Sequence, residues 1–206
     1  MPLINMNSRA LLTILVLMGL SLCVPCVKGD NAYVDVSVLD AKNMIDSNPL
    51  LVVLDVRNQS AYSSGHIRNA KLIPLSELET RIGELDKNRQ TLVYCQSGVK
   101  SAAASQILTD YDFNKVYNMI GGILAWTAMN YPVYVCYSSI QEAINNASDG
   151  ETIFISSGIY QECLVINKSL ALFGENRDTT IIDGGSNSTV VHIKADNTFV
   201  TDFTIQ

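Results

Sequence analysis

The sequence has few charged residues and few histidines, and each shortage excludes a class of protein. Only 17% of its 206 residues are charged and 48% are hydrophobic, so the chain is not mainly disordered. Its 20 acidic residues outnumber the 14 basic ones, which argues against nucleic acid as a partner, since phosphate binding needs a dense cationic face. Five cysteines are too few for a disulfide scaffold of this length, and their spacing is not that of metal ligands. The two histidines, His66 and His192, lie far apart in the sequence. We therefore predict no bound metal and no cofactor.

Residues 1–29 have the pattern of an export signal. Arg9 precedes a run without charge, residues 10–24. This run is shorter than the ~20 apolar residues of a membrane span and fits the apolar core of a secretory signal. Val27 and Gly29 occupy the small-residue positions of a cleavage site, so we predict cleavage after Gly29 and an extracytoplasmic protein: secreted, periplasmic or on the cell surface. An uncleaved N-terminal membrane anchor is the alternative.

The pattern of apolar residues changes near Pro132 and predicts two domains after the signal, residues 30–133 and 134–206. In the first domain, apolar runs typical of buried strands alternate with helix patterns, which indicates an α/β parallel sheet with helices on both faces. The expected strands are 50–56, 91–95 and 115–119. Helices are expected after the capping-box residues Ser37 and Ser76, and over residues 99–108.

The second domain is predicted to be all-β after one short helix over residues 138–147. Its strand patterns are short and are broken by Gly, Asn and Asp, and apolar and polar residues tend to alternate within them. The expected strands are 152–155, 163–166, 169–173, 180–182, 189–193 and 198–205.

Cys95 has the sequence surroundings of a nucleophile. It closes an expected buried strand, and a helix is expected to begin within a few residues. Ligands bind at the carboxyl ends of parallel strands, and a helix N-terminus there offers free N–H groups and a positive dipole. Both stabilise a thiolate and attract an anion. Gly98 allows the loop to curl around the sulfur, and Lys100 adds a positive charge. The alternative is that Cys95 is an inert buried cysteine.

The segment from Cys95 to Ser101 resembles the active-site loop of rhodanese-like domains. The resemblance covers residues 33–133, a complete single domain. Three further landmarks occur in the family's order: Asp55-Val56-Arg57; Gly65-His66-Ile67 with Ala70, Ile73 and Pro74; and Gly121-Gly122 with Trp126.

This resemblance implies an enzyme, a sulfurtransferase of the thiosulfate sulfurtransferase type. Cys95 would take the outer sulfur of a small anionic donor as a persulfide, and a thiol or cyanide would accept it. The residues expected to bind the donor are Gln96, Ser97, Gly98, Val99, Lys100, Ser101 and Arg57. Lys100 occupies the position where many members of this family have Arg. A lysine keeps the positive charge but cannot form bidentate hydrogen bonds to sulfonate oxygens, so the preferred donor is left open. Ser101 occupies the position where phosphatases of this fold need Arg, which argues against phosphatase activity.

The other landmarks are expected to be structural. We expect Asp55 and Arg57 to organise a polar network near the loop, with direct substrate contact by Arg57 as the alternative. His66 is expected to be a hydrogen-bonding residue rather than a base, and Trp126 to pack in the core. The pair Gly121-Gly122 is expected to form a tight turn before the last helix of the domain.

Residues 138–206 resemble the N-terminal cap and first coils of a right-handed parallel β-helix of the pectin-lyase-like class. The segments that carry the resemblance are 139–144, 149–153, 157–162, 172–175 and 180–184. Such stacks need several coils to bury a core, so we expect a truncated chain, with a partner that completes the stack or a marginal domain as alternatives. Pairing of Cys136 with Cys163 is left open.

These features favour an exported sulfurtransferase fused to the start of a β-helix. The rival hypothesis is a non-catalytic surface protein, in which the β-helix binds a ligand or glycan and the rhodanese fold senses redox state or docks a partner. The intact Cys95, in a loop that contains Gly98, favours the enzyme.

Overall fold

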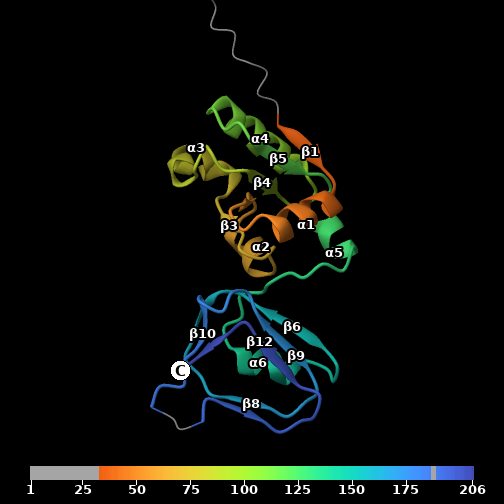
Figure 1. Ribbon diagram of the computed structural model, residues 1–206, viewed down its shortest axis with the longest axis vertical. Helices are drawn as coiled ribbons and strands as arrows, with labels where there is room; N and C mark the ends of the chain where they lie inside the picture. Colours follow the sequence, from red (N-terminus) through yellow and green to blue (C-terminus); the bar gives the residue numbers. More distant parts are fainter. Residues whose placement is uncertain (1–32, 187–188) are drawn as a thin grey trace, which may run out of the picture. The chain divides into compact units, whose positions relative to one another are not determined.

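The computed structural model describes residues 33–186 and 189–206, so the expected export signal lies outside the described residues. We call residues 33–133 the α/β part and residues 134–206 the strand-rich part (Figure 1). Within the described ranges, no helix combines the length and the apolar character that a membrane crossing requires.

The α/β part is built on one five-stranded sheet with the order β1-β5-β4-β2-β3. Each neighbouring pair of strands is parallel, so all the strands end at the same edge. The strands are β1 (Val34–Val36), β2 (Val52–Asp55), β3 (Lys71–Leu72), β4 (Thr91–Tyr94) and β5 (Val116–Met119). The three strands expected from the sequence are confirmed, while the short edge strands β1 and β3 were not predicted.

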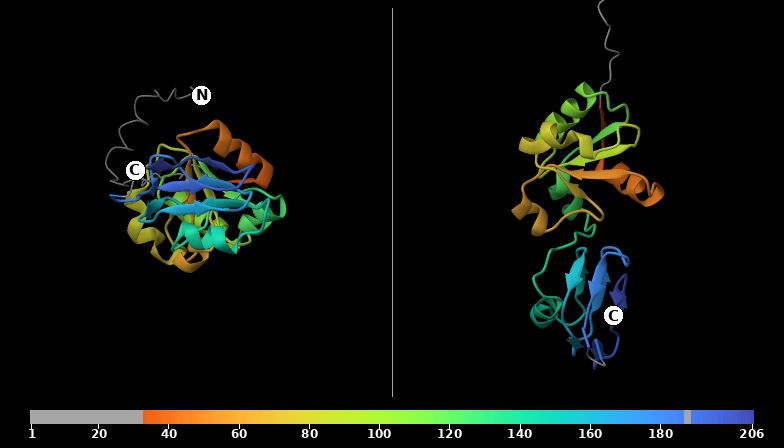
Figure 2. Two further views of the ribbon diagram at one scale, coloured as in Figure 1. Left: turned by 90° about the horizontal axis from the view of Figure 1, so that it is seen from below. Right: turned by 90° about the vertical axis from the view of Figure 1, so that its left-hand side faces the viewer.

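Helices cover both faces of this sheet, as predicted (Figures 1 and 2). The helices are α1 (Val38–Ser47), α2 (Gln59–Ser63), α3 (Leu78–Arg81), α4 (Val99–Asp110) and α5 (Gly122–Ala128), with 3₁₀ turns η1 (Leu75–Glu77) and η2 (Ile82–Glu84). On one face, Val93 and Cys95 pack with residues of α3 and α4. On the other face, Leu92 and Tyr94 pack with residues of α1 and α5. Alternate residues of β4 therefore serve two separate cores.

The two expected capping boxes have different outcomes. Ser37 caps α1, and its hydroxyl accepts a hydrogen bond from the Asp40 N–H at 3.1 Å. Ser76 caps nothing, which corrects the prediction, because it lies inside the 3₁₀ turn η1. Leu75 and Leu78 are three residues apart and pack in the same core. That spacing suits the three residues per turn of a 3₁₀ helix, and the expected α-helix begins after it, as α3 at Leu78.

The strand-rich part consists of one helix and three small parallel sheets. Its elements are α6 (Ile140–Asn146), β6 (Thr152–Ile155), β7 (Gly158–Tyr160), β8 (Leu164–Ile166), β9 (Ala171–Gly174), β10 (Thr180–Ile182), β11 (Val191–Ile193), β12 (Phe199–Thr201) and β13 (Thr204–Ile205). The sheets have the orders β12-β9-β6, β13-β10-β7 and β11-β8. Each strand thus pairs in parallel with the strand three places along the chain.

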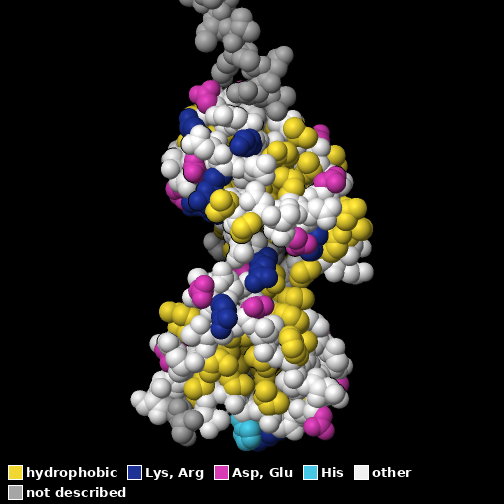
Figure 3. Space-filling model, in the orientation of Figure 1, with side chains coloured by type: hydrophobic (Ala, Val, Ile, Leu, Met, Phe, Trp, Pro, Cys, Tyr) yellow, Lys and Arg dark blue, Asp and Glu magenta, His cyan; other side chains and the backbone are white. Residues whose placement is uncertain are grey.

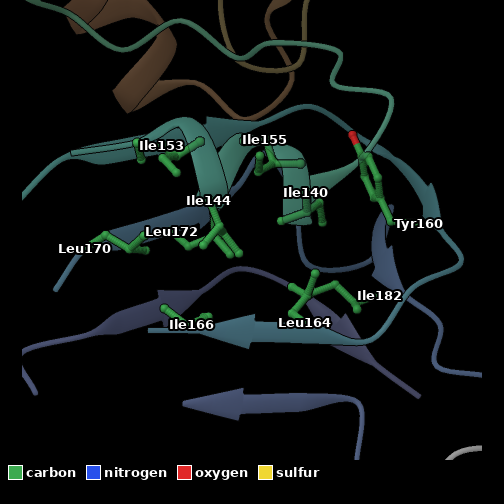
Figure 4. Close-up of a cluster of buried hydrophobic side chains, with 12 residues drawn as sticks. Ile140, Ile144, Ile153, Ile155, Tyr160, Leu164, Ile166, Leu170, Leu172 and Ile182 are labelled. Carbon is green, nitrogen blue, oxygen red and sulfur yellow. The ribbon is translucent and has the colours of Figure 1, made fainter. Parts of the chain in front are cut away.

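Aliphatic side chains from all three sheets and from α6 meet in one core (Figure 4). Ile140 and Ile144 of α6 are fully buried against it. Alternate residues leave the core: Leu164 and Ile166 of β8 are buried, whereas Val165 between them is exposed. On an outer face, Phe154, Phe173 and Phe199 stack with ring centroids 5.3 and 5.5 Å apart. Hydrophobic side chains gather on the strand-rich part in the view of Figure 3.

Two expectations for the strand-rich part need correction. The predicted strand 198–205 is two strands, β12 and β13, because Asp202 between them adopts a left-handed φ of +62° that breaks the extended chain. Strand β7 was not predicted. Cys136 and Cys163 are both free thiols in the structure.

Candidate active site

Cys95 lies at the carboxyl end of β4, the central strand of the sheet, and only 1% of its surface is exposed. The chain then turns through Gln96 and Ser97 and enters α4 at Val99. Gly98 makes this turn with φ of +97°, a backbone conformation that favours glycine. Its N–H points back and donates to the Cys95 sulfur at 3.2 Å. The loop therefore folds over the sulfur, as the sequence predicted.

Hydrogen bonds from this loop stabilise the thiolate of Cys95. Burial alone would raise the pKa of the Cys95 thiol, but donors from Ser101, Ser97 and Gly98 lower it below its ordinary value. The donors are the Ser101 hydroxyl and the N–H groups of all three residues. In the structure the Ser101 hydroxyl donates to the Gly98 carbonyl at 3.1 Å, and its single proton turns to the sulfur when the hydroxyl rotates. A lowered pKa makes the thiol a better nucleophile at neutral pH.

The N-terminus of α5 supports the loop from behind. The N–H groups of Ile123 and Leu124 donate to the carbonyls of Cys95 and Gln96, at 2.9 and 3.2 Å. Gly121 and Gly122 have φ of +79° and +58°, which confirms the expected tight turn before α5. A Cβ added at Gly122 would lie 2.5 Å from the Cys95 carbonyl oxygen. Only a glycine allows this close approach of the two backbones.

Arg57 and Asp55 form the polar network that was expected near the loop. The Arg57 Nε lies 3.0 Å from both Asp55 carboxylate oxygens, and its Nη2 donates to Asp55 at 2.6 Å and to the Gly65 carbonyl at 2.7 Å. Burial would lower the pKa of Arg57, but hydrogen bonds and the charge of Asp55 raise it. Its charge is thus already matched by Asp55. Arg57 nevertheless lines a hollow of about 250 Å³ with Gln96 and Leu124, and direct substrate contact stays a prediction.

The six loop residues predicted to bind the donor fall into two groups. Ser97, Gly98 and Ser101 direct donors at the sulfur. Gln96, Val99 and Lys100 are exposed around it, and Val99 has 76% of its surface accessible. The Lys100 side chain makes no ion pair with any described residue, so its charge is available to an anion.

The remaining landmarks have the structural roles that were expected. Trp126 is 2% exposed, and its ring N–H donates to the Pro132 carbonyl at 2.9 Å. The fully buried ring of His66 stacks on Tyr62 with centroids 3.9 Å apart. Among residues 33–186 and 189–206, no group of three or more His, Cys, Asp or Glu residues is arranged to hold a metal ion.

Sequence reasoning missed two residues that shape this site. Tyr94 directly precedes Cys95, is fully buried, and its hydroxyl accepts from the Ile67 N–H at 3.1 Å. Burial and the nearby Asp55 charge raise the pKa of Tyr94 well above its usual value, so it stays neutral. Glu175 of the strand-rich part contacts the segment that precedes β3. The strand pattern identifies Tyr94 as buried, but no local pattern identifies either contact.

We expect Ser101→Ala to raise the pKa of the Cys95 thiol, because one hydrogen bond to the thiolate is lost. The thiolate fraction is then smaller at every pH below the thiol's new pKa. Alkylation of Cys95 by iodoacetamide at neutral pH should slow by about threefold to tenfold, the worth of one such bond. Rates measured against pH, with the Cys95 peptide resolved by mass spectrometry, check this. An unchanged pH profile in a folded variant contradicts it.

We expect Gly122→Ala to displace the active-site loop and abolish the high reactivity of Cys95, since the new Cβ collides with the Cys95 and Gln96 backbone. Gly150→Ala is the matched control. Gly150 also has a positive φ, +82°, but an added Cβ there meets nothing within 4 Å. Both variants should lose about 1 kcal/mol of stability to backbone strain, and only Gly122→Ala should lose alkylation at Cys95. Equal alkylation in the two variants would refute the supporting role of α5.

Comparison with known proteins agrees with this geometry. A family model described as Rhodanese-like domain matches residues 37–129. Thiosulfate sulfurtransferase GlpE of Coxiella burnetii is 34% identical over 96 residues, which are 47% of this chain and 89% of that protein. A sulfurtransferase of Allochromatium vinosum is 30% identical over 93 residues, 45% of this chain and 86% of that protein.

One solved structure, that of a rhodanese-related protein from Thermoplasma volcanium, is 33% identical, covers 50% of this chain and 99% of that chain, and gives a TM-score of 0.46. The matched relatives and structures span about half of this chain. Through residues 37–129, this protein belongs to the rhodanese-like family.

Proposed function

We propose that the protein is a sulfurtransferase that carries sulfur as a persulfide on Cys95. The observation that carries the proposal is the loop folded over the buried Cys95 sulfur, with the Gly98 N–H donating to it at 3.2 Å and further donors on Ser97 and Ser101. These donors lower the pKa of the thiol and leave its environment suited to an anion. Relatives named thiosulfate sulfurtransferase support the same chemistry.

In the first step, the Cys95 thiolate attacks the outer sulfur of a donor such as thiosulfate. The new bond joins the Cys95 sulfur to that outer sulfur, and the sulfur–sulfur bond of thiosulfate breaks. Sulfite leaves with the bonding electron pair, and a persulfide anion remains on Cys95. The loop N–H groups stabilise this anion as they stabilise the thiolate, in the manner of an oxyanion hole.

In the second step, a thiolate or cyanide attacks the outer sulfur of the persulfide. The sulfur–sulfur bond breaks, the Cys95 thiolate leaves, and the acceptor becomes a persulfide or thiocyanate. No net oxidation occurs over the cycle, and no proton is needed at the sulfur. Lys100, exposed and without an ion pair among the described residues, attracts the anionic donor as a point charge.

We propose that the strand-rich part is the start of a right-handed parallel β-helix. Its support is the pairing of each strand with the strand three places along, so that three strands make one coil. The strands β11, β12 and β13 each pair on one side only within the described residues. An experimental structure of the protein tests this, and antiparallel pairing among these strands would contradict it.

We also propose that the protein works outside the cytoplasm. The support is the N-terminal sequence, in which the uncharged residues 10–24 follow Arg9 and precede small residues at Val27 and Gly29. The intact mass of the protein recovered from an exporting host tests it. A chain that retains residues 1–29 and stays in the cytoplasm would contradict it.

We expect Cys95→Ala to abolish sulfur transfer from thiosulfate to cyanide, because the persulfide has no other place to form. Cys136→Ala is the matched control, since Cys136 is also a free thiol but is exposed on the strand-rich part. It should retain turnover within about twofold, as surface substitutions away from a site change little. Turnover is measured as thiocyanate formed. Persistent turnover in Cys95→Ala, or none in the folded and reduced wild-type protein, would overturn the proposal.

A further inference from the structure

A buried carboxylate of the strand-rich part is bound to the α/β part. Glu175, directly after β9, is 3% exposed. Its Oε1 accepts from the Asn69 N–H at 2.6 Å and lies 3.3 Å from the Nε2 of His66. Its other carboxylate oxygen accepts from the Ser157 N–H at 2.8 Å. The Glu175 backbone carbonyl accepts from the Nε of Arg68 at 2.6 Å. One residue therefore joins residues 66–69 to the strand-rich part.

The charge of Glu175 is well compensated at this position. Burial alone would raise the pKa of Glu175, but His66 and the N–H groups of Ser157 and Asn69 lower it below its ordinary value. The carboxylate is thus ionised at neutral pH. The His66 ring is held from its other side, where Nδ1 lies 3.1 Å from the Tyr62 carbonyl oxygen. The arrangement is specific for a carboxylate, because each of its oxygens faces at least one N–H donor.

The segment that Glu175 holds is in turn bound to Arg57 and to Tyr94, the residue before Cys95. The Gly65 carbonyl accepts from the Nη2 of Arg57 at 2.7 Å. The Ile67 N–H donates to the Tyr94 hydroxyl at 3.1 Å. Tyr94 is the residue before Cys95, and the Arg57 guanidinium lies 5.6 Å from the centre of its ring. A set of contacts thus runs from Glu175 through residues 65–69 to Arg57 and to Tyr94, which adjoins Cys95 in the chain.

We propose that Glu175 is a positioning residue for the sulfur site. By fixing residues 66–69, it holds Tyr94 and Arg57 in the places that keep the Cys95 sulfur beneath the donors of its loop. The strand-rich part is then a working part of the sulfurtransferase and not an independent appendage. The described residues of the two parts belong to one compact unit, in keeping with this role. A role for Glu175 in catalysis rests on the proposed function. The effect of Glu175 on the reactivity of Cys95 does not.

The test compares Glu175→Gln with Glu162→Gln in the full chain. Glu162 is the matched control because its carboxylate also accepts three hydrogen bonds, from the Ser139 hydroxyl and the N–H groups of Ile140 and Gln141. All of these partners lie within the strand-rich part. In Glu175→Gln, the amide NH₂ must face the Asn69 or the Ser157 N–H, so one donor loses its acceptor. In Glu162→Gln, the same loss falls on donors at the start of α6 and not on residues 65–69.

The readout is the rate of Cys95 alkylation by iodoacetamide against pH, with the Cys95 peptide resolved by mass spectrometry. It needs no sulfur transfer, so it separates this proposal from the proposed function. We expect alkylation at neutral pH to fall by about threefold or more in Glu175→Gln, with the profile moved to higher pH, and to change by less than about twofold in Glu162→Gln. Amide hydrogen exchange of residues 65–70 should quicken only in Glu175→Gln.

An unchanged profile in folded Glu175→Gln would overturn the proposal, as would equal slowing in both variants, which would reveal general destabilisation. If Glu175→Gln does not fold, Arg68→Ala decides, because Arg68 is exposed and its loss removes one contact to the Glu175 carbonyl. A smaller shift in the same direction supports the proposal, and no shift overturns it. If the wild-type protein transfers no sulfur but its Cys95 profile depends on Glu175, the proposed function fails and the coupling stands.

Discussion

The convergence of backbone N–H groups on the sulfur of Cys95 is the constraint on which the rest of the structure depends. It requires a strand to end and a helix to begin within a few residues, with Gly98 in a left-handed conformation between them. It also requires the loop carbonyls to be occupied, which α5 achieves through Ile123 and Leu124. The glycines at 98 and 122 are therefore fixed by geometry, one by its φ and the other by the closeness of two backbones.

Some charged and polar groups in this site hold the structure around the loop, and others are free to attract an anion. The Arg57 guanidinium is committed to Asp55 and to the Gly65 carbonyl. Attraction of an anionic donor is then left to the loop N–H groups and to the exposed Lys100. In the proposed function, Lys100 offers the donor a point charge rather than bidentate hydrogen bonds, so the shape of the loop has the larger part in donor selectivity. The apolar Val99 and Leu124, each more than half exposed, flank this entrance.

The sequence predicted what is set by local patterns. The buried strands, the cap at Ser37 and the turn at Gly121-Gly122 each depend on residues within one turn or one strand, and each is confirmed. The loop around Cys95 was predicted because its Gly and helix start are adjacent in the chain. The cap at Ser76 failed because residues 75–77 form a 3₁₀ turn and the α-helix begins only at Leu78. The strand over 198–205 failed because Asp202 adopts a left-handed conformation, which Asp tolerates better than most residues but which its presence alone does not predict.

The contact between Glu175 and Asn69 joins residues 106 positions apart, and no periodicity or spacing signals such a pair. The same holds for the bond between Tyr94 and Ile67, which is 27 residues in span. Sequence patterns predict which face of a helix or strand is buried. They do not predict which polar group from a distant part of the chain forms a hydrogen bond with a residue on that face. The support beneath the active-site loop could therefore be found only from the folded chain.

The central claim is that one sulfur atom resides on Cys95 during the reaction. The most direct measurement is the intact mass of the reduced protein before and after thiosulfate, with peptide mapping of the product. The account predicts a gain of one sulfur atom, located on the Cys95 peptide, that is lost again when cyanide is added. No gain in a folded and reduced protein, or a sulfur located on Cys136 or Cys163, would contradict it.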